Sequence, residues 1–464
     1  MLARPACADS ARSATVDRPV GFSAATLHAV LESLVPAEAT GLVVALSGGP
    51  DSTALLAAAA EMQPGFRGLP LRAVHIDHGL QLSALEFRKA CRTLCDRLGV
   101  PLSIVAVEVG GAGESLEAAA RTARYAALAA QLQSGECLLT AHHRKDQAET
   151  LLLQALRGAG VKGMAAMPVC KVLGLGWHAR PMLEIAHEDL QQFSVGLQQS
   201  HSNDPMNEDE RFDRVYLRHA LWPLIRKRWP GVEITLSRTA LHMAEAQQLL
   251  DMAAAADVAR LRDGEALSVP GLRALAPLKR MNAVRLWLRE AGVEVPSTAR
   301  LEEALRQVFD AHADQNPAIV WGEKALRRYR QRMFVTDADA PSLSAAQQWA
   351  VAPGSSLELS PRLGTLSWIL HAGGLAAAKL PAVVTVRRRG GGEALKPNRL
   401  AKTQTVQHLC QTWGVLPWMR DALPLVFAGD ALIAVGDLWM DADWCAAADA
   451  PGLGISWNNA PLLT

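Results

Sequence analysis

The sequence has few cysteines, little net charge and no long apolar run. Its seven cysteines are scattered, odd in number and free of C-x-x-C pairs, which argues against a disulfide framework and favours a reducing compartment. The lack of a membrane-length apolar segment and of a signal-like N-terminus predicts a cytoplasmic protein with no membrane partner. Because the net charge is only +1, binding of nucleic acid would have to depend on local basic patches.

The segment 47–52 is the strongest functional signal in the chain. It consists of Ser47, Gly48, Gly49, Pro50, Asp51 and Ser52. A valine- and leucine-rich stretch precedes it and an alanine-rich stretch follows it, which predicts a strand, a tight turn and a helix. That geometry aims backbone N–H groups at a phosphate, and glycine lets the backbone approach closely. The loop has no lysine and is therefore not a Walker A motif. The alternative is a turn without function.

The first part of the chain alternates between short apolar segments and helical segments. Expected strands are residues 42–46, 71–76, 102–107, 137–140 and 176–180, and expected helices include 82–98 and 115–132. This alternation predicts an α/β fold with a Rossmann-like, doubly wound parallel sheet. Ligands of such sheets bind beyond the carboxyl ends of the strands, where the segment 47–52 would lie.

The rest of the sequence predicts two further domains. Residues 211–332 are arginine-rich and helical in pattern, with a helix over 237–262 that Ser237 would cap. Short strands such as 383–387 and 432–435 are typical of a small α+β domain. The prediction is a disordered N-terminal extension (1–20), a phosphate-binding domain (21–210), a helical domain (211–336), a linker (337–348) and a C-terminal domain (349–464).

Three more groups of polar residues fall near the expected strand ends or on the helices between them. They are His75 with Asp77, Glu117 with Arg121, and His142 with Asp146 and Glu149. The first pair lies on one face of a strand, as ordinary polar residues at a strand end also would. The second pair is either a helix salt bridge or the site of an arginine that clamps phosphates. The third group shares one helix face directly after a strand, which favours a functional interpretation.

Together these motifs resemble the tRNA(Ile)-lysidine synthetases, a family of PP-loop ATP pyrophosphatases. The resemblance rests on SGGPDS at 47–52, HIDHGL at 75–80, ARTARY at 120–125, AHHRKDQAET at 141–150 and ARPML at 179–183. It continues through residues 204–218 and through the tail segments 387–393, 402–406 and 417–426. Four residues depart from the family pattern: Lys145 replaces an acid, Met206 a serine and Val215 an asparagine, and His201 stands where a tryptophan is common.

The resemblance implies a reaction and a set of roles. Members of the family use ATP to join free L-lysine to C2 of the wobble cytidine in the CAU anticodon of tRNA(Ile), through an adenylated cytidine, with release of AMP and pyrophosphate. On this chain the resemblance implies ATP binding by residues 47–52 with His75 and Asp77, and Mg²⁺ binding by Asp51 and Asp77. It implies catalysis by Asp51, Arg121 and Asp146, and lysine binding by Asp146 and Glu149. The domain 21–210 would then be the catalytic domain, and the two later domains would bind tRNA.

Contacts to tRNA are expected from local basic groups. Residues 387–402 contain six basic residues against one acid, Glu393. The predicted RNA-binding residues are Arg214, Arg218, Arg387, Arg388, Arg389 and Lys402. Phosphate contacts are also expected from residues 226–229 and from the expected helical arginines Arg327, Arg328 and Arg330. For any single arginine the alternative is a solvated charged face.

Two other functions are compatible with the loop. A tRNA thiolase with the same loop would need paired cysteines or an iron–sulfur cluster, and the chain has no C-x-x-C pair. A PP-loop amidotransferase or synthetase for a small molecule would need a source of ammonia and would not use a basic, glycine-rich tail. The sequence leaves open whether the protein forms a homodimer.

Overall fold

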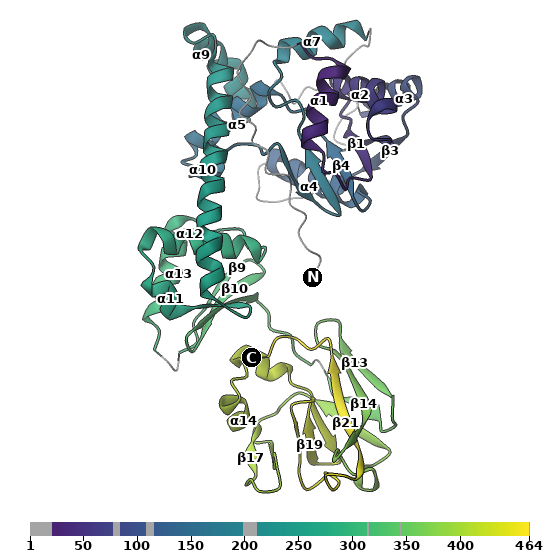
Figure 1. Ribbon diagram of the computed structural model, residues 1–464, viewed down its shortest axis with the longest axis vertical. Coiled ribbons are helices and arrows are strands. Elements are labelled where there is room, and N and C mark those ends of the chain that lie inside the picture. Colours follow the sequence, from purple (N-terminus) through teal and green to yellow (C-terminus); the bar gives the residue numbers. More distant parts are fainter. Residues whose placement is uncertain are drawn as a thin grey trace. The chain divides into compact units, whose positions relative to one another are not determined.

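Figure 1 shows the computed structural model of the chain, which describes residues 21–77, 84–107, 116–197, 211–312, 315–343 and 345–463. The chain divides into two compact units, Met1–Leu250 and Asp251–Thr464. The predicted disordered extension 1–20 and the departures His201 and Met206 lie outside the described residues. None of the described helices is long and apolar enough to cross a bilayer.

The first unit is built around a six-stranded sheet. Its strands are β1 (Gly41–Ala45), β2 (Leu71–Asp77), β3 (Leu102–Ala106), β4 (Glu136–Leu139), β5 (Cys170–Leu173) and β6 (Gly176–Ala179). The strand order is β3-β2-β1-β4-β6-β5, and all neighbours are parallel except β5 and β6. The predicted Rossmann-like parallel sheet is therefore confirmed, with one antiparallel edge strand that the sequence analysis does not predict.

Helices cover both faces of this sheet (Figure 1). They are α1 (Ala24–Leu34), α2 (Pro50–Met62), α3 (Ala84–Leu98), α4 (Leu116–Gln131), α5 (Arg144–Leu156), α6 (Val161–Met164) and α7 (His187–Gly196). Side chains alternate along β1, so Leu42 and Val44 join one core while Val43 joins the other. The first core includes residues of α1, α2, α3 and α7, and the second receives Leu128 from α4. This division of the core is that of a doubly wound sheet.

The direction of the strand order reverses at β1. The chain passes from β1 to β2 and β3 on one side of the sheet, and returns to place β4 on the other side of β1. Clefts that bind ligands form at such reversals, beyond the carboxyl ends of the strands. The segment 47–52 follows β1, and His142 and His143 follow β4, so both segments lie at this point.

The helices that follow residue 211 begin inside the first unit. They are α8 (Asp213–Tyr216), a π-helical turn (Leu217–Leu221), α9 (Trp222–Arg228) and α10 (Val232–Leu261). Leu217 and Trp222 are buried against Ala148 of α5. The prediction that Ser237 caps a helix is wrong, because α10 begins earlier, at Val232, directly after the turn at Pro230 and Gly231. The predicted domain limits stay predictions.

The second unit begins with helices and a sheet. The helices are α11 (Val269–Ala274), α12 (Pro277–Glu290) and α13 (Thr298–Asp310), and the strands are β7 (Arg262–Asp263), β8 (Ala266–Ser268), β9 (Ala318–Trp321), β10 (Lys324–Tyr329) and β11 (Arg332–Asp337). The sequence pattern predicts the helices but not the sheet. Arg327 and Arg328 lie on β10 and Arg330 in the next turn, so their helical placement is wrong. Tight turns at Gly322 and Arg330, both with positive φ, fold this segment into hairpins.

The C-terminal part of this unit is rich in strands, as predicted. The strands are β12 (Gln347–Ala350), β13 (Ser356–Ser360), β14 (Gly364–Ala372), β15 (Val383–Arg387), β16 (Ala394–Leu395), β17 (Gln404–Thr405), β18 (Leu425–Ala428), β19 (Ala431–Val435), β20 (Trp439–Met440) and β21 (Pro451–Asn458), with one helix, α14 (Val406–Thr412). The two larger sheets are β12-β15-β18-β19-β20 and β13-β14-β21. Trp349 and Trp368 stack in the core, with ring centroids 4.5 Å apart. The predicted α+β architecture is confirmed.

Candidate active site

The segment 47–52 is held in shape by its own serines. The Ser47 N–H donates to Ser52 Oγ (3.1 Å), and Ser52 Oγ donates to the carbonyl of Gly49 (3.1 Å). Gly48 has a φ of +87°, and a Cβ at this position would lie 2.9 Å from Phe87 Cδ1. Only glycine fits there without strain, because a side chain would contact Phe87 and would have to adopt a positive φ.

Helix α2 presents an uncapped N-terminus at this loop. It begins at Pro50, follows Gly49 and has no side chain that accepts a hydrogen bond from its first turn. Proline lacks an N–H group, so the first donors of the helix are those of the residues that follow it. These N–H groups and the helix dipole favour an anion, in agreement with a phosphate site.

His75 and Asp77, predicted to contact ATP, are both buried and already paired. His75 Nδ1 lies 2.8 Å from the carbonyl oxygen of Leu46, so its ring supports the residue just before the loop. The carboxylate of Asp77 forms an ion pair with Arg88 of α3. This pairing fits poorly with a role for Asp77 as a Mg²⁺ ligand.

Asp51 lies between two histidines. Its Oδ2 is 3.7 Å from His143 Nε2, and its Oδ1 is 3.6 Å from Nε2 of His187, the first residue of α7. The two imidazole rings are 4.6 Å apart between centroids. Desolvation raises the pKa of Asp51, although both histidines oppose the shift. Asp51 Oδ1 and His143 Nδ1 are buried without a hydrogen-bond partner, which is typical of a site that receives a ligand.

Asp146 and Glu149 of α5, the predicted lysine ligands, bind two arginines instead of lying free. Arg214 Nη2 and Arg218 Nη2 lie 3.1 and 2.8 Å from Asp146 Oδ1. Arg214 Nε and Arg218 Nε lie 3.0 and 2.8 Å from the carboxylate of the fully buried Glu149. Desolvation would raise the pKa of Asp146, but His143 and the two arginines outweigh it and lower the pKa to about 2. The backbone N–H of His143 also donates to Asp146 Oδ2 (3.1 Å).

Removing one arginine from this four-residue cluster is expected to destabilise the protein. Arg218→Ala leaves Arg214 as the one arginine paired with the two carboxylates among the described residues, which should lower the free energy of unfolding by about 1–3 kcal/mol. Arg226→Ala, in the exposed Arg226–Glu188 pair, is the matched control and should cost well under about 1 kcal/mol. Urea denaturation at pH 7 measures both. Equal losses for the two variants would contradict the expectation.

The pH dependence of the same cluster follows from the lowered pKa of Asp146. Its ordinary value is 3.8 and its value in the folded protein is about 2. The carboxylate therefore stabilises the folded state above about pH 4 and loses that contribution as the pH falls towards 2.

A chain of hydrogen bonds fixes the protonation of His142. Arg180 Nη2 lies 3.3 Å from His178 Nδ1, His178 Nε2 lies 2.8 Å from Thr140 Oγ1, and Thr140 Oγ1 lies 2.9 Å from His142 Nδ1. Arginine can only donate, so His178 donates from Nε2 and the threonine hydroxyl donates to His142. Desolvation lowers the pKa of His142 to about 3 and that of His178 to about 2, so both rings are neutral at pH 7. His142 therefore carries its proton on Nε2 and can donate it to a ligand.

Arg121 lies in a group of cations around Tyr125. The guanidinium carbons of Arg121 and Arg124 and the Lys171 ammonium lie 5.2, 5.6 and 5.7 Å from the centroid of the Tyr125 ring. The His178 ring packs on the same tyrosine, at 5.4 Å. Desolvation and repulsion from Arg180 lower the pKa of Lys171, as expected where cations gather without an anion. The structure thus brings Arg121 to the region of His142 and gives it no acid partner among the described residues.

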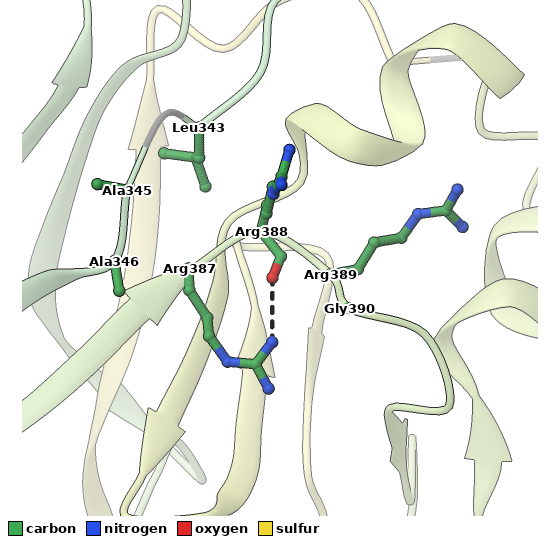
Figure 2. A pocket seen from close by; sticks show the side chains of 7 residues that line it. All are labelled: Leu343, Ala345, Ala346, Arg387, Arg388, Arg389 and Gly390. Atoms are coloured by element: carbon green, nitrogen blue, oxygen red, sulfur yellow. Dashed lines mark hydrogen bonds between the residues drawn. The ribbon is translucent and has the colours of Figure 1, made fainter.

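The predicted RNA-binding arginines of the tail differ in whether their guanidinium groups form ion pairs within the described residues. The side chains of Arg387, Arg388 and Arg389 point in different directions (Figure 2). Together with Leu343 and Ala346 they line a cavity of about 320 Å³. Arg387 pairs with Glu393 (3.1 Å), and Arg389 with Asp421 (2.6 Å). Arg388 is exposed, and its guanidinium has no ion pair within the described part of the chain. Lys402 is also exposed.

The arginines of β10 are structural. Arg328 is buried and donates to the carbonyls of Val308 (2.6 Å) and Ala311 (2.9 Å) at the end of α13. Arg327 donates to the carbonyl of Ala338 (2.8 Å) and Arg330 to that of Gln411 (2.7 Å). These guanidinium groups are engaged within the fold, which weakens their expected role as phosphate contacts.

Comparison with known proteins agrees with this geometry. Residues 23–225 match the PP-loop domain family, 267–334 the TilS substrate binding domain and 384–457 the TilS substrate C-terminal domain. A tRNA(Ile)-lysidine synthase of Alkalilimnicola ehrlichii is 40% identical over 426 residues, which cover 90% of this chain and 93% of that protein. The chain belongs to the tRNA(Ile)-lysidine synthase family. A second member of the family, from Coxiella burnetii, is 37% identical over 418 residues, 89% of this chain and 92% of that protein.

Membership of the tRNA(Ile)-lysidine synthase family confirms the predicted family and the predicted class of function, an ATP-using ligase that modifies tRNA. The thiolase and the small-molecule synthetase are therefore not favoured. Two features of the site are not apparent from the sequence: His187, and the ion pairs of Arg214 and Arg218 with carboxylates. His187 stands at the start of a helix that follows β6, and helix starts after parallel strands meet at the same edge of the sheet.

Proposed function

We propose that this protein joins L-lysine to C2 of the wobble cytidine in the CAU anticodon of tRNA(Ile), in the cytoplasm, and so changes the codon and the amino acid that the tRNA serves. The observation that carries the proposal is the position of His143, which lies 3.7 Å from Asp51 of the phosphate loop and 3.5 Å from Asp146 of the carboxylate pair. A nucleotide on the loop and an amine at the carboxylates would then lie on either side of one imidazole.

Adenylation is the first step of the proposed reaction. The cytidine O2 attacks the α-phosphorus of ATP, the bond to pyrophosphate breaks, and the oxygen becomes part of a good leaving group. The loop 47–52 and the N-terminus of α2 would hold the leaving pyrophosphate. The neutral His142, which donates from Nε2, and Arg121 would stabilise charge that develops on phosphate oxygens.

Mg²⁺ is expected to enter with ATP, where it neutralises charge on the phosphates. Magnesium is commonly held by one or two carboxylates together with substrate phosphates. Asp51 fits this role, since its Oδ1 has no hydrogen-bond partner at the loop. Asp77 fits it less well, because its carboxylate is paired with Arg88.

Lysine transfer is the second step. The ε-ammonium first loses a proton to solvent, and the neutral amine then attacks C2. The bond from C2 to the oxygen breaks, AMP leaves with that oxygen, and the new C–N nitrogen releases a second proton to solvent. A carboxylate whose pKa is about 2 is a weak base, so Asp146 serves better to hold and orient the lysine ammonium than to remove its proton. Glu149 would also contact the ammonium group. Arg214 and Arg218 would then have to give up some of their hydrogen bonds with the two carboxylates.

Incorporation of labelled lysine tests the proposed function. Purified protein, ATP and tRNA(Ile) transcripts with a CAU anticodon are expected to give lysine-labelled tRNA together with AMP and pyrophosphate. Transcripts in which the wobble cytidine is replaced by uridine serve as the matched control and should remain unlabelled. Labelling of both transcripts, or of neither, would refute the proposed specificity.

The tail provides a prediction about tRNA binding. Arg388→Ala should make the dependence of log K on log[salt] shallower by about one, because one phosphate contact is lost. Arg389→Ala should change the slope less, since Asp421 already pairs with that guanidinium. Filter binding of tRNA over a range of salt concentrations measures both slopes. If the two variants, and the triple replacement of Arg387, Arg388 and Arg389, all keep the wild-type slope, the cluster is a solvated face.

A further inference from the structure

The Asp51, His143 and His187 side chains form a group whose geometry differs from that of ordinary hydrogen bonds. The distances of 3.6 and 3.7 Å from the Asp51 oxygens to the imidazole nitrogens exceed those of a hydrogen bond. One ligand atom from each residue lies within 4.8 Å of the other two. Among the described residues, this is the one group of three or more histidine, cysteine, aspartate or glutamate side chains that meets this condition.

These separations are close to those between the ligands of one metal ion. Zinc binds imidazole nitrogen at about 2.0–2.1 Å and carboxylate oxygen at about 2.0–2.2 Å, so neighbouring ligand atoms of a tetrahedral ion lie about 3.3 Å apart. Contraction by a few tenths of an ångström would bring Asp51 Oδ1 and His187 Nε2 to that separation. Small side-chain rotations suffice, since His187 stands at the first residue of α7 and is only half-buried.

The donor set favours a transition metal over magnesium. Mg²⁺ prefers oxygen ligands, whereas two imidazoles with one carboxylate are typical of zinc and other first-row divalent ions. Sites with three protein ligands leave a position open for water or for a substrate oxygen. Asp51 Oδ1 is buried without a hydrogen-bond partner. His143, whose Nε2 faces Asp51 and also lies 3.5 Å from Asp146 Oδ2, is only 4% exposed.

We propose that Asp51, His143 and His187 form a binding site for a divalent transition metal such as Zn²⁺, with an open coordination position next to the phosphate loop. The site would form in the protein without ATP, and it shares Asp51, but no other ligand, with the predicted Asp51–Asp77 pair. Asp77 is not part of the site, because its carboxylate forms an ion pair with Arg88.

Titration of the protein with Co²⁺ tests the proposal. Co²⁺ replaces Zn²⁺ in such sites and reports its ligands through visible absorption. The full-length protein, freed of metals by a chelator and kept without ATP or tRNA, should bind one equivalent. His187→Gln and His143→Gln should each weaken binding by about 100-fold or more, since the loss of a mere outer-shell partner already costs about 10–100-fold.

His242→Gln is the matched control, because it removes an exposed histidine that pairs with Glu245 away from this group. It should leave the affinity for Co²⁺ unchanged. Three results would overturn the proposal: no stoichiometric binding, unchanged binding in the His187 variant, or a thiolate charge-transfer band. Such a band would show that a cysteine binds the ion, for example Cys91, which lies beside His75.

The outcome does not depend on lysidine formation. Metal binding is measured without substrates, and lysine incorporation is measured separately with Mg²⁺ and ATP. A protein that labels tRNA but binds no Co²⁺ would refute the metal site alone, and one that binds Co²⁺ but labels no tRNA would refute the proposed function alone.

Discussion

Asp51→Ala is expected to reduce the formation of AMP by about 10²–10³-fold or more, the range seen when one preorganised group at a reacting phosphate or oxyanion is removed. Asp51 lies in the loop, in the first turn of α2, and its carboxylate is the best placed one to hold Mg²⁺ against the phosphates. Because burial raises its pKa, its replacement by a neutral side chain should not destabilise the fold. The affinity for tRNA should also stay near that of the unaltered protein.

The measurement is tRNA-dependent release of AMP and pyrophosphate at saturating ATP. Asp96→Ala is the matched control, since Asp96 is an exposed residue of α3. It should release AMP at the normal rate. If folded Asp51→Ala protein forms AMP as fast as this control does, the assignment of the nucleotide site to residues 47–52 is wrong.

Local sequence patterns predict the first sheet because each strand carries its own signal. The five expected strands each overlap an observed one, since parallel strands buried on both faces appear as continuous apolar runs. The loop was predicted for the same reason, because strand, glycines and helix follow one another directly. The hairpins of β9 to β11 carry weaker sequence signals for strands. The arginines on β10 resemble the solvated face of a helix, because the sequence does not show the backbone carbonyls to which they donate.

The partners within the site could not be predicted from sequence in the same way. Arg214 and Glu149 are 65 positions apart, and nothing local to either residue indicates that they meet. The same holds for His187 and Asp51, which come together only because the ends of β1, β4 and β6 lie at one edge of the sheet. Motifs in the sequence thus identify the functional residues, whereas the strand order decides which of these residues contact one another.

Asp146→Asn is expected to separate the two chemical steps. The amide oxygen can still accept hydrogen bonds from Arg214 and Arg218, so most of the local contacts should survive. The bond that the His143 N–H donates to the second carboxylate oxygen is lost, because the amide NH2 group cannot accept it. The variant lacks the negative charge that would hold the lysine ammonium. Adenylation should therefore proceed within a few-fold of normal, while lysine transfer should fall by about 10²–10³-fold, and a higher lysine concentration should restore part of it.

A single-turnover experiment with tRNA measures both steps, pyrophosphate release for the first and labelled lysine in tRNA for the second. Asp213→Asn is the matched control, because Asp213 forms an exposed ion pair with Arg157 and should leave both steps unchanged. Partial rescue by lysine would show that the charge of Asp146 acts through binding of the amine. If pyrophosphate release fell together with lysine transfer, Asp146 would belong to the nucleotide site, which it could reach through His143, 3.5 Å from its carboxylate. The buried cluster with Glu149, Arg214 and Arg218 would then serve to fix the phosphate loop, and the lysine ligands would have to lie elsewhere.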